Sequence, residues 1–141
     1  MKVGILTLPL VDNFGGILQA AALYRSLIDL GHEPVFLEKK LWRPVSHQMI
    51  GKVLRAIPGH DIGNTRSAAK ARMRHVPFLD KFISDREGPL YSKAALANTI
   101  KRRNLGAVIV GSDQVWRPDY IPDVDTGSYF LDIEGDFQKI S

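Results

Sequence analysis

Cysteine is absent from this chain of 141 residues, which excludes a disulfide scaffold and any zinc or iron–sulfur site with cysteine ligands. The sequence also lacks an apolar run of about 18 residues, the length that a membrane-spanning helix needs. The N-terminus becomes polar too early for a secretory signal peptide. These absences predict a cytoplasmic protein, and the apolar fraction of 45% and charged fraction of 24% are those of an ordinary globular domain.

Several familiar motifs are missing as well. The chain contains no Gly-x-Gly-x-x-Gly, no Gly-Lys-Ser/Thr and no Gly-x-Ser-x-Gly sequence, so the dinucleotide fingerprint, the Walker loop and the serine-hydrolase elbow are excluded. Its four histidines lie in different segments and form no i, i+4 pair. No metal site is therefore predicted.

Charge is distributed unevenly along the chain. Lysine plus arginine number 2 against 4 acids in residues 1–38, 15 against 4 in residues 39–103, and 2 against 7 in residues 104–141. The basic middle is either an electrostatic footprint for nucleic acid, an anionic membrane surface or phosphorylated sugars, or a set of solvated helix faces. Because few aromatic residues interrupt it to stack on bases, no nucleic-acid partner is predicted. Peripheral contact of residues 39–103 with a membrane surface stays open.

Apolar periodicity predicts a β-α-β unit at the N-terminus. Residues 2–8 have the pattern of a buried parallel strand, and apolar positions in residues 16–30 recur at three and four, as on one face of a helix. Gly31 stands where a C-cap is expected, and residues 34–37 predict the next strand. A further buried strand is predicted at residues 107–110. The predicted fold class is therefore α/β, a Rossmann-like three-layer open parallel sheet.

The middle of the chain, residues 39–104, is interpreted as a basic, largely helical insertion or crossover region. Prolines and glycines divide it, and helices are predicted at residues 45–57, 66–84 and 92–104. Residues 118–127 are acidic and predicted to be irregular. Since a doubly wound sheet normally has five or six strands, residues 1–141 are predicted to form an incomplete N-terminal domain.

Polar residues follow two of the predicted strands. The strand at 107–110 leads into GSDQVW at residues 111–116, and the strand at 2–8 leads into DNFGGILQ at residues 12–19. Open α/β sheets bind their ligands at the carboxyl ends of the strands. We therefore expect these two loops to share one crevice.

The loop at residues 111–116 contains Asp113, whose role has two interpretations. A buried carboxylate at a strand end can act as a general acid or base toward a substrate hydroxyl, whereas an exposed one can cap a helix that begins at Gln114. Trp116 is suited either to stacking on a sugar ring or to filling a corner of the core.

The loop at residues 12–19 can also be interpreted either as a binding site or as a structural turn. Gly15 and Gly16 allow positive φ and close backbone approach, and the first-turn amides of the following helix can hold a phosphate or carboxylate. Asn13 can equally be a structural helix cap. Gln19, one turn into that helix, faces either the crevice or bulk solvent.

Four blocks in this order resemble the polysaccharide pyruvyl transferase family: KVGILT at residues 2–7, NFGGILQA at 13–20, LGH at 30–32 and VIVGSDQVW at 108–116. The resemblance covers mainly residues 1–38 and 105–141. It implies two Rossmann-like halves arranged as in type B glycosyltransferases, with this chain as the N-terminal half and the second domain absent from it. Lys139-Ile140-Ser141 then resembles the opening of a further strand.

The resemblance implies transfer of the enolpyruvyl group of phosphoenolpyruvate to sugar hydroxyls, giving a pyruvate ketal in a cell-surface polysaccharide. Phosphoenolpyruvate is the donor substrate, no cofactor is expected, and the acceptor is a sugar or a lipid-linked oligosaccharide. Most of the arginine and histidine contacts to the donor are expected in the second half, so the fragment alone is expected to be inactive. Asp113 is the candidate catalytic residue, and the candidate substrate-binding residues are Asn13, Gly15, Gly16, Gln19, Ser112, Gln114 and Trp116.

Two other functions remain open on the sequence. One is the half of a glycosyltransferase that uses a nucleotide sugar, a class with the same architecture. The other is a non-catalytic module that binds a sugar or nucleotide in the same crevice.

Overall fold

A computed structural model describes residues 1–10, 14–40, 76–111, 115 and 123–141. Residues 76–82 are helical and lie between β2 and β3. The other elements, in chain order, are β1 (Lys2–Leu6), α1 (Phe14–Asp29), β2 (Glu33–Lys39), β3 (Arg86–Leu90), α4 (Lys93–Arg103), β4 (Ala107–Val110), α5 (Asp123–Tyr129) and β5 (Gln138–Ile140).

The strands form one parallel sheet of five in the order β3-β2-β1-β4-β5. β1 is the central strand, and its last residue, Leu6, lies opposite Leu37 of β2 and Val110 of β4. The α/β class with an open parallel sheet is therefore confirmed, and the arrangement is consistent with a Rossmann-like sheet. The chain builds outward from β1 to β2 and β3, then returns to the other side of β1 for β4 and β5.

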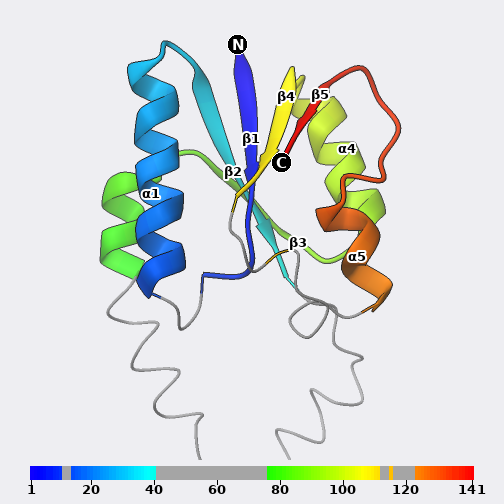
Figure 1. Cartoon of the computed structure of the whole chain (residues 1–141), viewed down its shortest axis with the longest axis horizontal. Coiled ribbons are helices and arrows are strands. Elements are labelled where there is room, and N and C mark those ends of the chain that lie inside the picture. The colour runs from blue at the N-terminus through cyan, green and yellow to red at the C-terminus, as the bar shows by residue number, and fades with distance from the viewer. Residues whose placement is uncertain (11–13, 41–75, 112–114, 116–122) are drawn as a thin grey trace, which may run out of the picture.

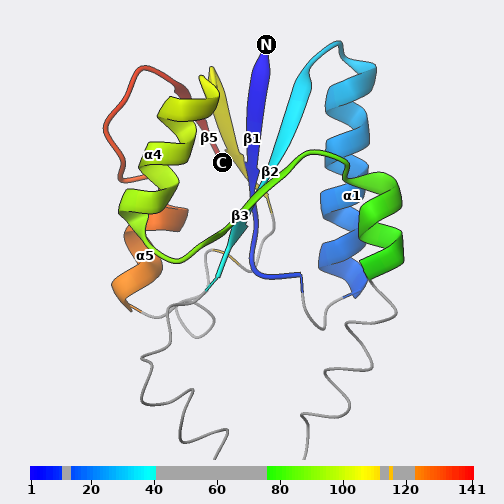
Figure 2. The same cartoon turned by 180° about the vertical axis from the view of Figure 1, so that it is seen from behind.

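Helices cover both faces of this sheet (Figures 1 and 2). α1 and residues 76–82 lie side by side on one face, whereas α4 and α5 lie on the opposite face. This division follows from the topology, because crossovers of one hand place their helices on opposite faces when the chain reverses its direction across the sheet. The predicted three-layer architecture is thus present in the described part of the chain.

Each face of the sheet has its own apolar core. Alternate residues of the strands point to opposite faces, so Val3 and Ile5 of β1 pack toward α1, while Leu6 packs toward α4 and α5. The α1 core also contains Ile17, Ala20, Tyr24, Leu27, Phe36, Leu79, Ile83 and Ala107. The α4–α5 core also contains Val35, Leu37, Leu90, Leu96, Ile100, Leu105, Val108, Val110, Val115, Tyr129, Leu131 and Ile133.

Local signals in the sequence account for the helix ends. α1 stops before Gly31, whose φ is 78°, and the amides of Gly31 and His32 donate to the carbonyls of Ile28 and Leu27 in a Schellman pattern. α4 begins after Ser92, whose hydroxyl accepts from the amide of Ala95 at 3.1 Å. The predicted C-cap at Gly31 and the predicted helix at 92–104 are confirmed.

Three segments differ from the sequence-based expectation. β3 contains Gly88 and Pro89, which were expected to break structure; it is an edge strand, where the missing proline amide costs the ladder little. α5 is helical through residues 123–127, which were predicted to be irregular. Of the helix predicted at 66–84, the described residues 76–82 are helical, while the helix predicted at 45–57 lies outside the described residues.

Tyr24 links α1 to the segment that leads into β3. Its side chain is buried, and its hydroxyl accepts from the amide of Asp85 at 3.0 Å and lies 3.2 Å from the hydroxyl of Ser84. The adjacent carbonyl of Asp85 accepts from the amide of Phe36 in β2 at 2.9 Å. These contacts hold α1 and the start of β3 against the same strand.

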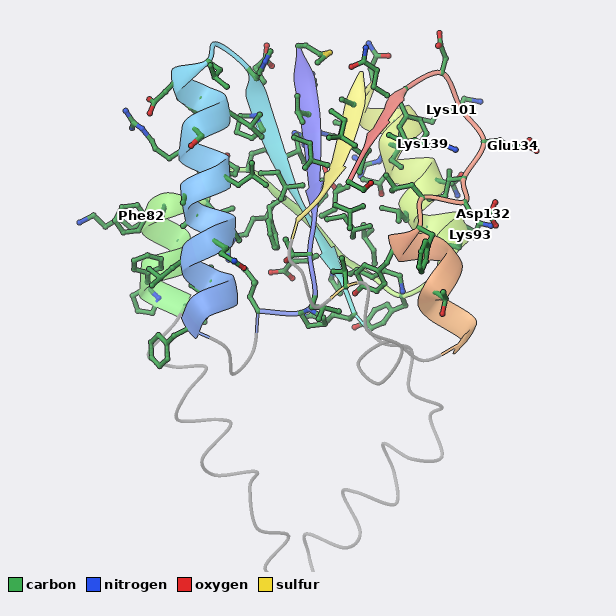
Figure 3. The ribbon with its side chains drawn as sticks, in the orientation of Figure 1. Phe82, Lys93, Lys101, Asp132, Glu134 and Lys139 are labelled. Carbon is green, nitrogen blue, oxygen red and sulfur yellow. The ribbon has the colours of Figure 1, made fainter. Side chains whose placement is uncertain are left out.

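An ionic cluster joins the end of α4 to the start of β3. Arg103 donates to Glu87 at 2.8 Å and also pairs with Asp85, while Arg102 donates to Glu87 at 2.6 Å. On the neighbouring surface, Lys93 of α4 pairs with Asp132, which follows α5, and Figure 3 shows the two side chains side by side. The first set of ion pairs links α4 to β3, which directly precedes it, and the second links α4 to the segment after α5.

We expect the Glu87 cluster to make stability depend on pH. The hydrogen bond from Arg102 lowers the pKa of the Glu87 carboxyl below its ordinary value of 4.5, with burial opposing the effect. A carboxyl whose pKa is lowered by folding stabilises the fold fully above its unfolded-state pKa, and that contribution is lost as pH falls through the lowered value. Urea unfolding between pH 7 and pH 3 should therefore show a loss of stability below about pH 4.5 that Glu87→Gln reduces. An unchanged profile in that variant would contradict the assignment.

Within the described part of the chain, no helix combines the length and apolar character needed to cross a bilayer.

Candidate functional site

The carboxyl ends of β1 and β4 lie side by side. Leu6 and Val110 are the last paired residues of the two strands, and the amide of Gly111 donates to the carbonyl of Leu6 at 3.0 Å. The chain leaves β1 in one direction across the sheet and reaches β4 from the other, so this is the topological switch point at which open α/β sheets bind ligands. The two strand ends are adjacent, and the shared crevice of the loops that follow them remains a prediction.

The start of the loop after β4 also meets α1. A Cβ added to Gly111 would lie 3.3 Å from Cδ2 of Leu23 in α1 and 3.7 Å from Cγ2 of Thr7. Thr7 follows β1 directly and is itself buried. The ends of two strands and the middle of α1 therefore pack together at this point, and Gly111 permits their close approach.

We name this region the switch-point edge and define it by residues 7–10, residues 14–19, Lys39, Gly111 and Val115. It lies at the end of the sheet opposite the N-terminus in Figure 1. The N-terminus of α1 lies at this edge, and the helix dipole makes such an end favourable for negative charge.

Two predicted ligand-binding glycines belong to the first turn of α1. Gly15 and Gly16 have helical backbone conformation, because α1 begins at Phe14 rather than at Gly16. The positive φ considered for them is therefore incorrect, and what they offer is an unshielded backbone at the helix start. Gln19 is exposed on the next turn of α1, and its place in the crevice remains a prediction.

The other predicted site residues lie outside the described residues: Asn13, Ser112, Asp113, Gln114 and Trp116. Between the last two, Val115 is described and is fully buried in the α4–α5 core, together with Leu6 and Leu37. Val115 therefore belongs to the core at the carboxyl end of that face of the sheet. The roles of the five undescribed residues remain predictions.

Lys39 is a residue of this edge that the sequence analysis did not single out. It is the last residue of β2, and only 1% of its surface is exposed, although it is a lysine. The preceding strand pattern carried a weak signal, since Lys39 continues the alternation of Val35 and Leu37. That signal was obscured by Lys40, because a pair of adjacent lysines after a strand is typical of an exposed loop.

Among the residues that the structure describes, no group of three or more histidine, aspartate or glutamate side chains could hold a metal ion. The absence of a metal and of a cofactor remains a prediction, since residues 112–114 and 116–122 lie outside the described part of the chain.

Comparison with known proteins found no family model, no curated protein and no solved structure that matches this chain. The functional argument therefore depends on the strand topology, on the groups at the switch-point edge and on the sequence blocks that border it.

Proposed function

We propose that this chain is the N-terminal Rossmann-like half of a polysaccharide pyruvyl transferase with a two-domain architecture like that of type B glycosyltransferases. The observation that carries the proposal is the neighbouring position of β1 and β4 at the switch point. Two of the four sequence blocks that resemble the family, residues 13–20 and 108–116, follow or include the ends of these strands in the sequence. A shared edge is what a common substrate site requires.

The reaction needs proton management and stabilisation of charge. A proton is added to the methylene carbon of phosphoenolpyruvate, and a sugar hydroxyl oxygen attacks the adjacent oxocarbenium-like carbon while its own proton passes to a base. The bond from that carbon to the phosphate oxygen then breaks, and a second sugar hydroxyl closes the ketal ring as its proton passes to the departing phosphate. One carboxylate that first donates and then accepts a proton can serve such a sequence.

In this proposal Asp113 handles these protons or orients the attacking hydroxyl. Asn13 and Gln114 hydrogen-bond sugar or donor oxygens, and the amides of Gly15 and Gly16 at the start of α1 approach an anionic group. The position of α1 supports this role, since the helix N-terminus lies at the switch-point edge. Ser112, Gln19 and Trp116 complete the substrate contacts.

The test is an incubation of the protein expressed from its full reading frame with phosphoenolpyruvate and candidate glycans. A pyruvyl transferase releases phosphate and produces the methyl proton signal of a pyruvate ketal on the glycan. Release of a nucleoside diphosphate from a nucleotide sugar would instead indicate a glycosyltransferase. Binding of sugar without any release would assign a non-catalytic module, and either result would contradict the proposal.

A further inference from the structure

The two helices on the α1 face expose apolar side chains where they run side by side. Leu18 of α1 is 57% exposed, and Val76 and Phe82 of the helix at residues 76–82 are 47% and 44% exposed. The ring of Phe82 packs on that of Phe78, with the centroids 4.5 Å apart. Figure 3 shows Phe82 on the outer side of its helix, away from the sheet. We name these four residues the paired-helix patch.

The helical register places Leu18 on the flank of α1 that lies nearer to the second helix. Leu23 packs against Gly111 after β4, so its side of α1 faces β4. Leu18, five residues earlier, lies about 140° away around the helix axis, on the other flank. Asp80 of the second helix pairs with Arg86 of β3, so that helix lies on this other flank as well. The exposed side chains of the two helices therefore belong to one surface.

The described charges beside the patch leave one cation without a carboxylate partner. The ammonium group of Lys81 lies 5.4 Å from the centroid of the Phe82 ring. The acids of these two helices are Asp29 and Asp80, and each is paired with an arginine instead. Among the described residues, Lys81 therefore contributes a positive charge at the rim of an apolar surface.

The sequence that leads into the second helix adds further positive charge. Residues 41–75 carry seven lysines and arginines against one acid, and four of the seven lie in residues 66–74. Since residue 74 is only two positions before Val76, chain connectivity alone keeps part of this charge close to the patch. The surface is thus apolar at its centre and has an excess of cations next to it.

We propose that the paired-helix patch docks on an anionic membrane surface. The apolar side chains enter the boundary between headgroups and acyl chains, and the neighbouring cations face acidic headgroups. A second copy of the chain fits the patch poorly, because it would bring the same positive charge against this one. The proposal goes beyond the proposed reaction and does not depend on it.

The test is co-sedimentation of the chain with vesicles of phosphatidylserine and phosphatidylcholine, and separately of phosphatidylcholine alone. We expect binding to the mixed vesicles only. Phe82→Gln and Leu18→Gln should each weaken it about tenfold, the loss usual for withdrawing one large side chain from an apolar environment. Leu30→Gln is the matched control and should bind like wild type, because Leu30 is 72% exposed but lies beyond the C-terminal end of α1. Equal losses in the two leucine variants, equal binding to both kinds of vesicle, or no binding by wild type would overturn the proposal.

A second measurement covers variants that do not fold. In the wild-type chain, a nitroxide-labelled lipid in bicelles of the same mixture should broaden the methyl NMR signals of Leu18 and Val76 and leave those of Leu30 unchanged. Equal broadening of all three would contradict the proposal. A lipid-free dimer that Phe82→Gln abolishes, detected by sedimentation equilibrium, would assign the patch to a second copy of the chain and would also overturn it.

Discussion

Asp113→Asn is expected to lower the kcat for pyruvyl transfer by roughly 10²- to 10⁴-fold, the range usual for loss of a general acid or base. Asparagine keeps the shape and the hydrogen-bonding oxygen of aspartate, so it preserves a helix cap, but it cannot exchange a proton with the substrate. Initial rates of phosphate release from phosphoenolpyruvate, measured on the protein from the full reading frame, provide the test. The substitution therefore distinguishes a proton-transfer role of Asp113 from a helix-capping role.

Asp136→Asn is the matched control for that experiment. Asp136 is exposed and precedes β5, at the end of the sheet opposite the switch-point edge, so its loss should leave the rate unchanged. Circular dichroism of both variants verifies that they fold. Full turnover by a folded Asp113→Asn variant would assign Asp113 as a cap and remove it from the catalytic machinery.

Gly88→Ala is expected to destabilise the fold by about 3 kcal/mol, the sum of backbone strain and overpacking at one position. A Cβ at Gly88 would lie 2.6 Å from Cβ and 2.8 Å from the carbonyl oxygen of Glu38. Relief by rotation of a side chain is not available, because the nearest atoms belong to or adjoin the backbone of β2. The φ of Gly88, 155°, adds a conformation that alanine rarely adopts.

Gly31→Ala is the comparison for Gly88→Ala. Gly31 also has positive φ, at 78°, but no atom lies within 4 Å of an added Cβ, so only the strain of about 1 kcal/mol is expected. Urea unfolding of the two variants gives the difference directly. Equal losses would show that the approach of Gly88 to β2 contributes nothing to stability.

The β-α-β start of the fold was predictable because its residues carry consistent local signals. Residues 107–110 were predicted as a strand with the bounds that β4 has, and the stripe of Ile17, Ala20 and Leu27 placed α1. β3 could not be predicted in this way. It is a short edge strand whose sequence, REGPL, has breaker residues at its centre, and it forms because β2 supplies the partner groups.

Of the candidate site, the sequence predicted the strand ends but not Lys39. The convergence of β1 and β4 followed from a general rule of parallel sheets, since carboxyl ends share one edge. The strand alternation of Val35, Leu37 and Lys39 was a weak local signal for the burial of Lys39, and the adjacent Lys40 obscured it. The burial of Lys39 results from tertiary packing rather than from local propensity.

The central claim is that the carboxyl edge between β1 and β4 binds the ligand. Its most direct test is a backbone amide NMR titration of the chain with phosphoenolpyruvate, in which Gly15, Gly16 and Gly111 report on the switch-point edge. Gly31 and Gly106, at the opposite edge, are the internal controls. We expect the first three signals to shift together in a saturable manner while the two controls stay fixed. Shifts confined to the controls, or spread equally over both edges, would contradict the claim.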